Sequence, residues 1–189
     1  TKMFPRQALR ELIANALVHQ DFTITGRGVK IEVYSDRVEI SNAGIPPIEP
    51  DRFIDEDRAR NERLAGLMRK FRICEQKGSG VDKVTALTEA YQLPAHEVFV
   101  GDLATTVVLY AHRDFSEMGK PDRIRACYQH CVLQYVTRKR MTNQSLRERF
   151  GLSEGATATV SQVIGAAKEA GKIKLDDSET TSTRYARYV

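Results

Sequence analysis

Apolar and polar residues recur along the chain with two different periods. Helical spacing of apolar positions predicts a first helix that begins at Pro5, and further helices at 82–91, 121–138, 143–150 and 156–170. Strict alternation, typical of half-buried strands, predicts strands at 28–34, 38–41, 105–110, 172–175 and 184–189. This order predicts an α/β protein, in which a two-layer α/β sandwich is followed by a winged helix-turn-helix domain.

The apolar pattern breaks between residues 116 and 121, where a glycine and a proline stand close together. We expect one domain at 1–117 and a second at 120–189. From Lys120 onward the chain has 13 Lys and Arg against 7 Asp and Glu, a net charge of +6. The remainder has 16 basic and 18 acidic residues, a net charge of −2. The basic second domain could face a polyanion such as DNA, although the same charge could mark only a soluble surface.

Composition excludes some classes of protein. Hydrophobic residues make up 41% and charged residues 29%, which is enough apolar material for a core and argues against a disordered chain. No apolar run approaches the roughly 20 residues that cross a bilayer, so no membrane partner is expected. The first residues hold neither a signal-peptide core nor an initiator Met, which predicts a cytoplasmic fragment of a longer protein.

The three cysteines, Cys74, Cys127 and Cys131, form no CxxC pair. This pattern argues against a disulfide framework and favours a reducing compartment. Cys127 and Cys131 lie one helical turn apart, and a buried helix face is the expected explanation, with a metal site as the alternative.

The candidate DNA-binding residues lie in the basic domain. We expect the helix at 156–170 to enter the major groove, where small polar side chains and an amide can reach base edges. Hydroxyls at a helix start and the basic residues of the hairpin could donate to phosphates. The candidates are Thr142, Ser145, Thr157, Thr159, Ser161, Gln162, Lys168, Lys172, Lys174, Arg184 and Arg187. The alternative is a winged helix used for protein contact or dimerisation, and the acidic hairpin tip at Asp176 and Asp177 argues against insertion of the hairpin into a groove.

In the first helix, Glu11, Asn15 and His19 share one polar line at i, i+4 and i+8. A carboxylate can orient or deprotonate a water, and an amide oxygen one turn away can hold a hard cation. A solvated helix face explains the same spacing, so the pattern by itself leaves both interpretations open.

Several motifs together resemble a known family. They are the helix from Ala8 to Phe22, then Asn42-Ala43-Gly44-Ile45-Pro46, then Arg60-Asn61, then Lys77-Gly78-Ser79-Gly80-Val81. This set is similar to the RecG-related transcriptional regulators, which carry a divergent ATPase domain of the gyrase, heat-shock ATPase, histidine kinase and mismatch-repair superfamily, here called GHKL-like. Longer members have an upstream Schlafen-type, AlbA-like domain, which would precede Thr1.

The resemblance implies an ATP and Mg²⁺ site. It makes Glu11 the general base, Asn15 the Mg²⁺ ligand, and Asn42 with Gly44 the first glycine box, which reads adenine. It makes Lys77, Gly78, Ser79 and Gly80 the second glycine box and phosphate contacts, with Arg60 as a further phosphate partner. Thr106, or Thr105, would lie near the adenine, and residues 47–72 would form a lid.

The sequence also departs from the superfamily. The first glycine box has one glycine instead of two, and Asn42 stands where an Asp is usual. The leading hypothesis is a prokaryotic transcriptional regulator that binds duplex DNA and uses the α/β domain to sense an adenine nucleotide or to form a homo-oligomer. The alternatives are a Mg²⁺-dependent, DNA-associated ATPase and a nucleotide-free interaction scaffold. A helicase is not supported, because the sequence has no GxxxxGK[ST] phosphate loop.

Overall fold

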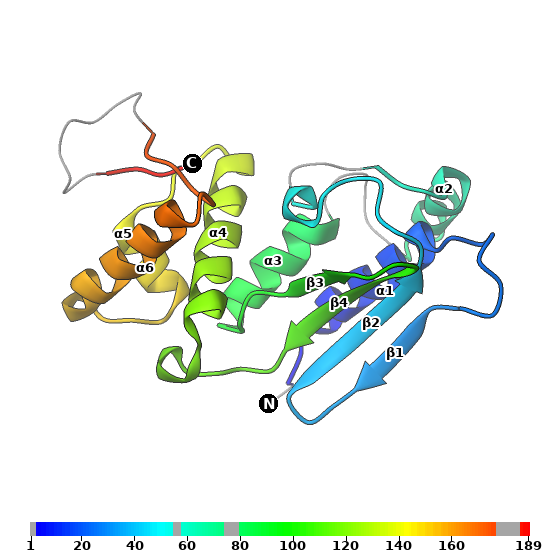
Figure 1. The fold of residues 1–189 in the computed structure, drawn as a ribbon, viewed down its shortest axis with the longest axis horizontal. Coiled ribbons are helices and arrows are strands. Elements are labelled where there is room, and N and C mark those ends of the chain that lie inside the picture. Colours follow the sequence, from blue (N-terminus) through cyan, green and yellow to red (C-terminus); the bar gives the residue numbers. More distant parts are fainter. Residues whose placement is uncertain (1–2, 55–57, 74–79, 177–185) are drawn as a thin grey trace.

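The computed structural model describes residues 3–54, 58–73, 80–176 and 186–189. Its first part is a four-stranded antiparallel sheet with helices packed against one face (Figure 1). The strands follow the order β1-β2-β4-β3 and comprise β1 Lys30–Val33, β2 Arg37–Ala43, β3 Glu97–Val100 and β4 Ala104–Tyr110. The mixed α/β class expected from the sequence is confirmed.

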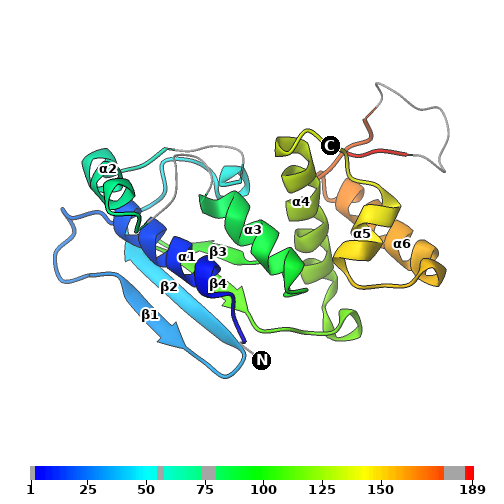
Figure 2. The ribbon, with the colours of Figure 1, turned by 180° about the vertical axis from the view of Figure 1, so that it is seen from behind.

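Two helices, α1 (Arg6–His19) and α3 (Gly80–Ala90), cover the inner face of this sheet (Figure 2). Ala8, Leu12 and Ala16 recur at helical spacing along α1, and they are buried against Val84 of α3 and the strands. The outer face is polar. Arg37 and Glu39 form an ion pair there, and the Tyr110 hydroxyl donates to Glu97.

Two elements were not expected from the sequence. The helix α2 (Glu62–Lys70) lies inside the charged stretch and packs Ala65 and Met68 against the end of α1. The edge strand β3 pairs with β4, so that Val98 lies beside Val107. The structure also contains three short 3-10 helices, η1 Pro50–Arg52, η2 Phe115–Glu117 and η3 Glu154–Ala156, among the described residues.

Three helices form the other end of the molecule, with α4 nearest to the sheet (Figures 1 and 2). They are α4 Lys120–Val136, α5 Asn143–Arg149 and α6 Thr157–Glu169. Cys127, Leu146 and Val160 are fully buried in the core that the three helices share. Tyr188, near the end of the chain, bridges to both Met141 and Leu175.

The core of the three helices also includes Ala95, from the connection between α3 and β3, and Met118, which follows β4. Cys127 and Cys131 are buried free thiols on α4, and burial raises the pKa of each to about 12. Both thiols therefore serve as small core residues. Among the described residues, no group of three or more His, Cys, Asp or Glu side chains could hold a metal ion. Within the same described part, no helix is both long and apolar enough to cross a membrane.

Candidate functional site

A pocket opens on the helix-covered side of the sheet, between α1, the start of α3 and the segment that leads to α2. Five of the residues expected at a nucleotide site line it, namely Glu11, Asn15, Asn42, Gly44 and Gly80. These residues come from three separate segments of the chain, namely α1, the end of β2 and the start of α3. The fold therefore brings together the helix motif and parts of both glycine boxes.

The α1 side of the pocket carries an acid and an amide one turn apart. The Glu11 side chain is buried, with the residue 1% exposed, and its Oε1 lies 3.1 Å from Nη2 of Arg10. Asn15 lies against Gly80, where an added Cβ would come within 3.3 Å of the Asn15 Nδ2. The absence of a side chain at Gly80 thus lets the N-terminal end of α3 approach the amide. Backbone N–H groups at a helix N-terminus attract anions such as phosphate.

The sheet side of the pocket presents polar groups at paired strand ends. Asn42 of β2 pairs with Thr105 of β4. The Asn42 Nδ2 donates to the carbonyl oxygens of His19 (3.2 Å) and Ala43 (3.0 Å), which leaves its Oδ1 to accept from another donor. The Thr105 hydroxyl donates to the Gly44 carbonyl at 2.8 Å.

Thr106 does not line the pocket, and Thr105 does. Successive side chains in a strand point to opposite faces, so the two threonines cannot share one. The position at the pocket therefore favours Thr105, the alternative that the sequence left open, and the contact of this threonine with a ligand stays a prediction.

The Arg60 guanidinium is engaged within the fold, which differs from the free phosphate partner that the resemblance implies. Its Nη1 lies 3.1 Å from the Asp21 carboxylate, and its Nη2 donates to the Ile45 carbonyl at 2.5 Å. Hydrogen bonds from the Thr23 hydroxyl and backbone N–H lower the pKa of Asp21. The neighbouring Asn61 amide donates to Val18 and Gln20 carbonyls at the end of α1. The Arg60-Asn61 motif thus fastens the start of α2 to the ends of α1 and β2.

Gly44 lies beside Asp21 and Arg60 and has a φ of +107°. A Cβ at Gly44 would lie 2.9 Å from the Cβ of Asp21. We expect Gly44→Ala to lower the free energy of unfolding by about 2–3 kcal/mol, because strain at positive φ and the close contact act together. Urea unfolding measures the loss.

Gly26→Ala provides the matched control, because Gly26 has a φ of +77° and nothing lies within 4 Å of its added Cβ. That variant should lose only about 1 kcal/mol from the positive φ. Equal losses in the two variants would show that the contact with Asp21 is not tight.

Three cationic or titratable side chains line the pocket without having been predicted from the sequence, namely Arg58, Arg69 and His96. The two arginines lie in the charged stretch, where the sequence does not distinguish them from the many other charged residues. His96 is 3% exposed, and its Nδ1 is buried without a hydrogen-bond partner among the described residues. Burial, reinforced by the charge of Arg125, lowers the pKa of His96 to about 4. No feature of the local sequence distinguishes this histidine from a core residue.

The remaining predicted residues of the second glycine box, Lys77, Gly78 and Ser79, lie outside the described residues, as does Arg184 of the hairpin. Mg²⁺ usually binds through one or two protein oxygens together with substrate phosphates and water. The Asn15 amide oxygen, beside the start of α3, fits that pattern. A divalent ion here would complete its coordination with oxygens of a phosphate-bearing ligand.

The outer side of α6 carries a group of exposed polar side chains, as the sequence predicts. They are Thr157, Thr159, Ser161, Gln162 and Lys168. Asn143 of α5 donates to the Ser161 hydroxyl and to the Thr157 carbonyl, which fixes the start of α6 against α5. Lys174 and Arg187 are exposed beside the bridges of the chain's last segment.

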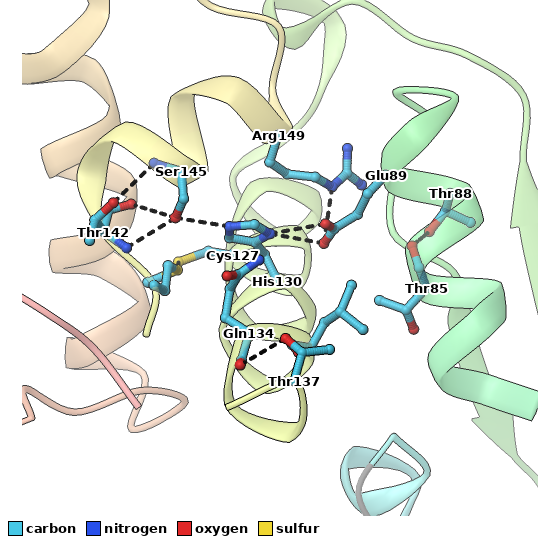
Figure 3. Close-up of polar contacts among 12 residues, drawn as sticks. Thr85, Thr88, Glu89, Cys127, His130, Gln134, Thr137, Thr142, Ser145 and Arg149 are labelled. Carbon is cyan, nitrogen blue, oxygen red and sulfur yellow. Dashed lines mark hydrogen bonds and ion pairs between the residues drawn. The ribbon is translucent and has the colours of Figure 1, made fainter. Parts of the chain in front are cut away.

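Thr142 and Ser145 are used within the fold (Figure 3). The Thr142 side chain accepts from the Ser145 backbone N–H, and the Ser145 hydroxyl accepts from the Thr142 backbone N–H, a reciprocal cap on α5. The Ser145 hydroxyl also lies 3.1 Å from Nε2 of buried His130. Capping and the contact with His130 therefore already engage these hydroxyls, and their contact with phosphates stays a prediction.

The same histidine joins the two parts of the molecule (Figure 3). Nδ1 of His130 lies 3.0 and 3.1 Å from the two carboxylate oxygens of Glu89 on α3. Nε of Arg149 lies 3.5 Å from the same carboxylate, and its Nη2 donates to the Leu93 carbonyl at 2.7 Å. The arrangement ties α3 to α4 and α5 through buried polar groups.

Lys172 also belongs to a contact between the two parts. Its ammonium pairs with the Asp51 carboxylate, and the Tyr128 hydroxyl of α4 donates to the Asp51 carbonyl at 2.6 Å. Asp51 lies in η1, between the pocket-lining residues Ile48 and Phe53. The wall of the pocket is thus anchored to the helical end of the molecule.

Residues 26–109 match the model of a family described as "Putative ATP-dependent DNA helicase recG C-terminal". The match supports a RecG-related ATPase-like domain in this part of the chain. The matched range begins after α1, so Glu11 and Asn15 lie outside it. No curated protein matches the chain.

Among solved structures, the chain is similar to the DIP2311 protein from Corynebacterium diphtheriae, with a TM-score of 0.55 and 17% sequence identity. The similarity covers 88% of this chain and 37% of that protein. The chain therefore spans little more than a third of the length of its structural relative. At this identity the likeness concerns the fold alone.

Proposed function

We propose that the pocket binds an adenine nucleotide and that the chain responds to this ligand. The observation that carries the proposal is the convergence of Glu11, Asn15, Asn42, Gly80 and Thr105 on one pocket from separate segments. If these side chains only formed a solvated surface, we would not expect them to line one pocket together. The family match adds support, because it describes an ATPase-type domain.

The chemistry of the lining suits the two ends of a nucleotide. Ile40 and Val107 provide an apolar surface for a flat base, and the Oδ1 of Asn42, which accepts no hydrogen bond from the described residues, can accept one from an exocyclic amine. Asn15 and the start of α3 would meet the phosphates, with Mg²⁺ held between the Asn15 oxygen and phosphate oxygens. The ion would neutralise phosphate charge when bound.

Calorimetric titration with a non-hydrolysable ATP analogue, with and without Mg²⁺, tests the proposal. Binding is expected to depend on Mg²⁺, and Asn15→Ala is expected to weaken it at least tenfold. Gln7→Ala removes an exposed amide from the same helix and should leave the affinity unchanged. The absence of heat and of thermal stabilisation at millimolar nucleotide would refute nucleotide binding and favour an interaction scaffold.

A second function concerns the three C-terminal helices. Their order, with bridges from Tyr188 to Met141 and Leu175, supports a winged helix-turn-helix. In this proposal α6 enters the major groove of duplex DNA, and the nucleotide site makes the chain a ligand-responsive transcriptional regulator. The exposed polar side of α6 and the net charge of +6 from Lys120 onward favour it. Because Asp51 engages Lys172, the exposed Lys168 and Lys174 are the cationic candidates that we take further.

DNA binding is tested by the salt dependence of affinity. The logarithm of the association constant should fall with the logarithm of salt concentration with a slope of several units, about 0.9 for each neutralised phosphate. A Lys168→Glu/Lys174→Glu double variant should reduce that slope by about 2. Lys70→Glu on α2 is the control, since it changes charge far from α6. A complete lack of binding at low salt would reject this function.

A further inference from the structure

The proposed nucleotide contacts do not involve His96, although its side chain lines the pocket. Among the described residues of the lining, it alone has a buried side-chain nitrogen without a hydrogen-bond partner. It precedes β3, is 3% exposed and lines the pocket. Its Nδ1 makes no hydrogen bond. A buried polar atom without a partner costs free energy, and it is usually satisfied by protein, water or ligand. A ligand group that entered the pocket could satisfy it.

The environment of the His96 imidazole favours an uncharged ligand group as its hydrogen-bond partner. Burial and the nearby Arg125 disfavour the imidazolium, and the pKa of His96 falls to about 4. A neutral imidazole offers one N–H donor and one lone pair. It therefore suits the nitrogen-bearing edge of a heterocycle better than a phosphate, which prefers cationic donors.

The sheet register gives the position of His96 relative to Asn42. Asn42 pairs with Thr105, whereas Val98 pairs with Val107, and His96 lies two residues before Val98 on the same face. His96 and Thr105 are thus separated by about 13 Å along the strand direction, at roughly 3.3 Å per residue. Apolar Ile40 and Val107 lie between them. Asn42 lies one strand beyond Thr105, on β2, so two strand spacings of about 4.8 Å bring the separation of the Asn42 and His96 Cα atoms to about 16 Å. Both side chains line the pocket from these positions, and the space between their polar atoms suits a bicyclic base with a hydrogen bond at each edge.

Side chains of α4 hydrogen-bond to the backbone at His96 and at the residue before it. The Gln129 amide donates to the His96 carbonyl at 2.8 Å, and Arg125 reaches the Ala95 carbonyl at 3.4 Å. These bonds place the ring on a rigid element, which a residue that discriminates between ligands requires.

We propose that His96 hydrogen-bonds the edge of a purine base opposite the edge that meets Asn42, and that it sets which base the pocket accepts. This inference rests on the proposed nucleotide-binding function. His96 is a specificity-determining residue in this proposal, and its imidazole forms no covalent bond with the ligand.

The test compares ATP with 3-deaza-ATP and 7-deaza-ATP, in each of which one ring nitrogen is replaced by CH. In the natural sequence, one deaza analogue is expected to bind about tenfold more weakly than ATP, the effect of one lost hydrogen bond. In His96→Phe, which keeps a ring but removes both nitrogens, ATP should bind about tenfold more weakly and that deaza analogue should bind as ATP does. His96→Asn, whose amide can replace Nδ1, should restore part of the affinity for ATP.

Thermal unfolding of both variants separates loss of the contact from loss of the fold. We expect a folded His96→Phe variant to bind ATP about tenfold more weakly than the wild-type chain does, and to bind ATP no more tightly than the deaza analogue that the wild-type chain disfavours. If wild-type and a folded His96→Phe instead bind all three ligands identically, the proposal for His96 is overturned while nucleotide binding stands. If the wild-type chain binds none of the three, the proposed function and this inference both fail.

Discussion

Replacing Glu89 by alanine is expected to lower the free energy of unfolding by about 3–5 kcal/mol, the usual cost of removing one partner from a buried ion pair. The Glu89 carboxylate faces both His130 and Arg149 across the junction between α3 and the C-terminal helices. The Arg149 side chain is only 3% exposed, and burial lowers the pKa of Arg149. Without Glu89, the guanidinium keeps its carbonyl partner at Leu93 but loses the opposite charge.

Urea unfolding measures this effect, and Glu148→Ala is the control. Glu148 is exposed on α5, where its side chain accepts a hydrogen bond from Gln144, so its loss should cost under about 0.5 kcal/mol. A Glu89→Leu/Arg149→Met double variant should recover most of the stability, because removal of both charges leaves neither unpaired. A loss under about 1 kcal/mol in Glu89→Ala would contradict the importance of the pair.

Glu11→Gln is expected to reduce ATP hydrolysis at least 100-fold while nucleotide affinity stays within about threefold of the wild-type value. The substitution keeps the shape of the side chain and removes the carboxylate that can accept a proton from water. The position fits this role, because Glu11 is buried at the pocket and lies one turn before Asn15. Phosphate release measures turnover, and calorimetry measures binding.

Glu39→Gln is the matched control for hydrolysis, since Glu39 lies on the polar outer face of the sheet and pairs with Arg37. It should leave turnover unchanged. Turnover that persists in Glu11→Gln would exclude Glu11 as the general base. A wild-type chain that binds ATP without hydrolysing it would favour the sensor over the enzyme.

The regular part of the fold follows from local patterns in the sequence. The α1 stripe, the hairpin of β1 and β2, strand β4 and helices α3 to α6 all have the period of their element, and the structure confirms them. The helix α2 was missed because its nine residues bury only Ala65 and Met68 among many charges. The strand β3 was missed because its four residues at the sheet edge do not show a clear alternation in burial.

The candidate site was only partly predictable. Glu11 and Asn15 could be paired from helical spacing, and Asn42, Gly44 and Gly80 came from the family resemblance. The role of Arg60 could not be predicted, because its partner Asp21 lies 39 residues earlier in the chain. The position of His96 depends on how α4 packs behind β3, which no local pattern encodes.

Contacts from the part of the chain after β4 reach three places in the α/β part. Gln129 binds the His96 carbonyl, Arg149 binds the Leu93 carbonyl, and Lys172 pairs with Asp51 in the pocket wall. Residues 26–109, the range that sequence comparison delimits, contain none of the three donors. The cooperative folding unit is therefore larger than the matched domain, and we expect heat to melt the chain in a single transition. A chain that ended after β4 would leave the pocket without the contacts that hold His96 and the wall at Asp51.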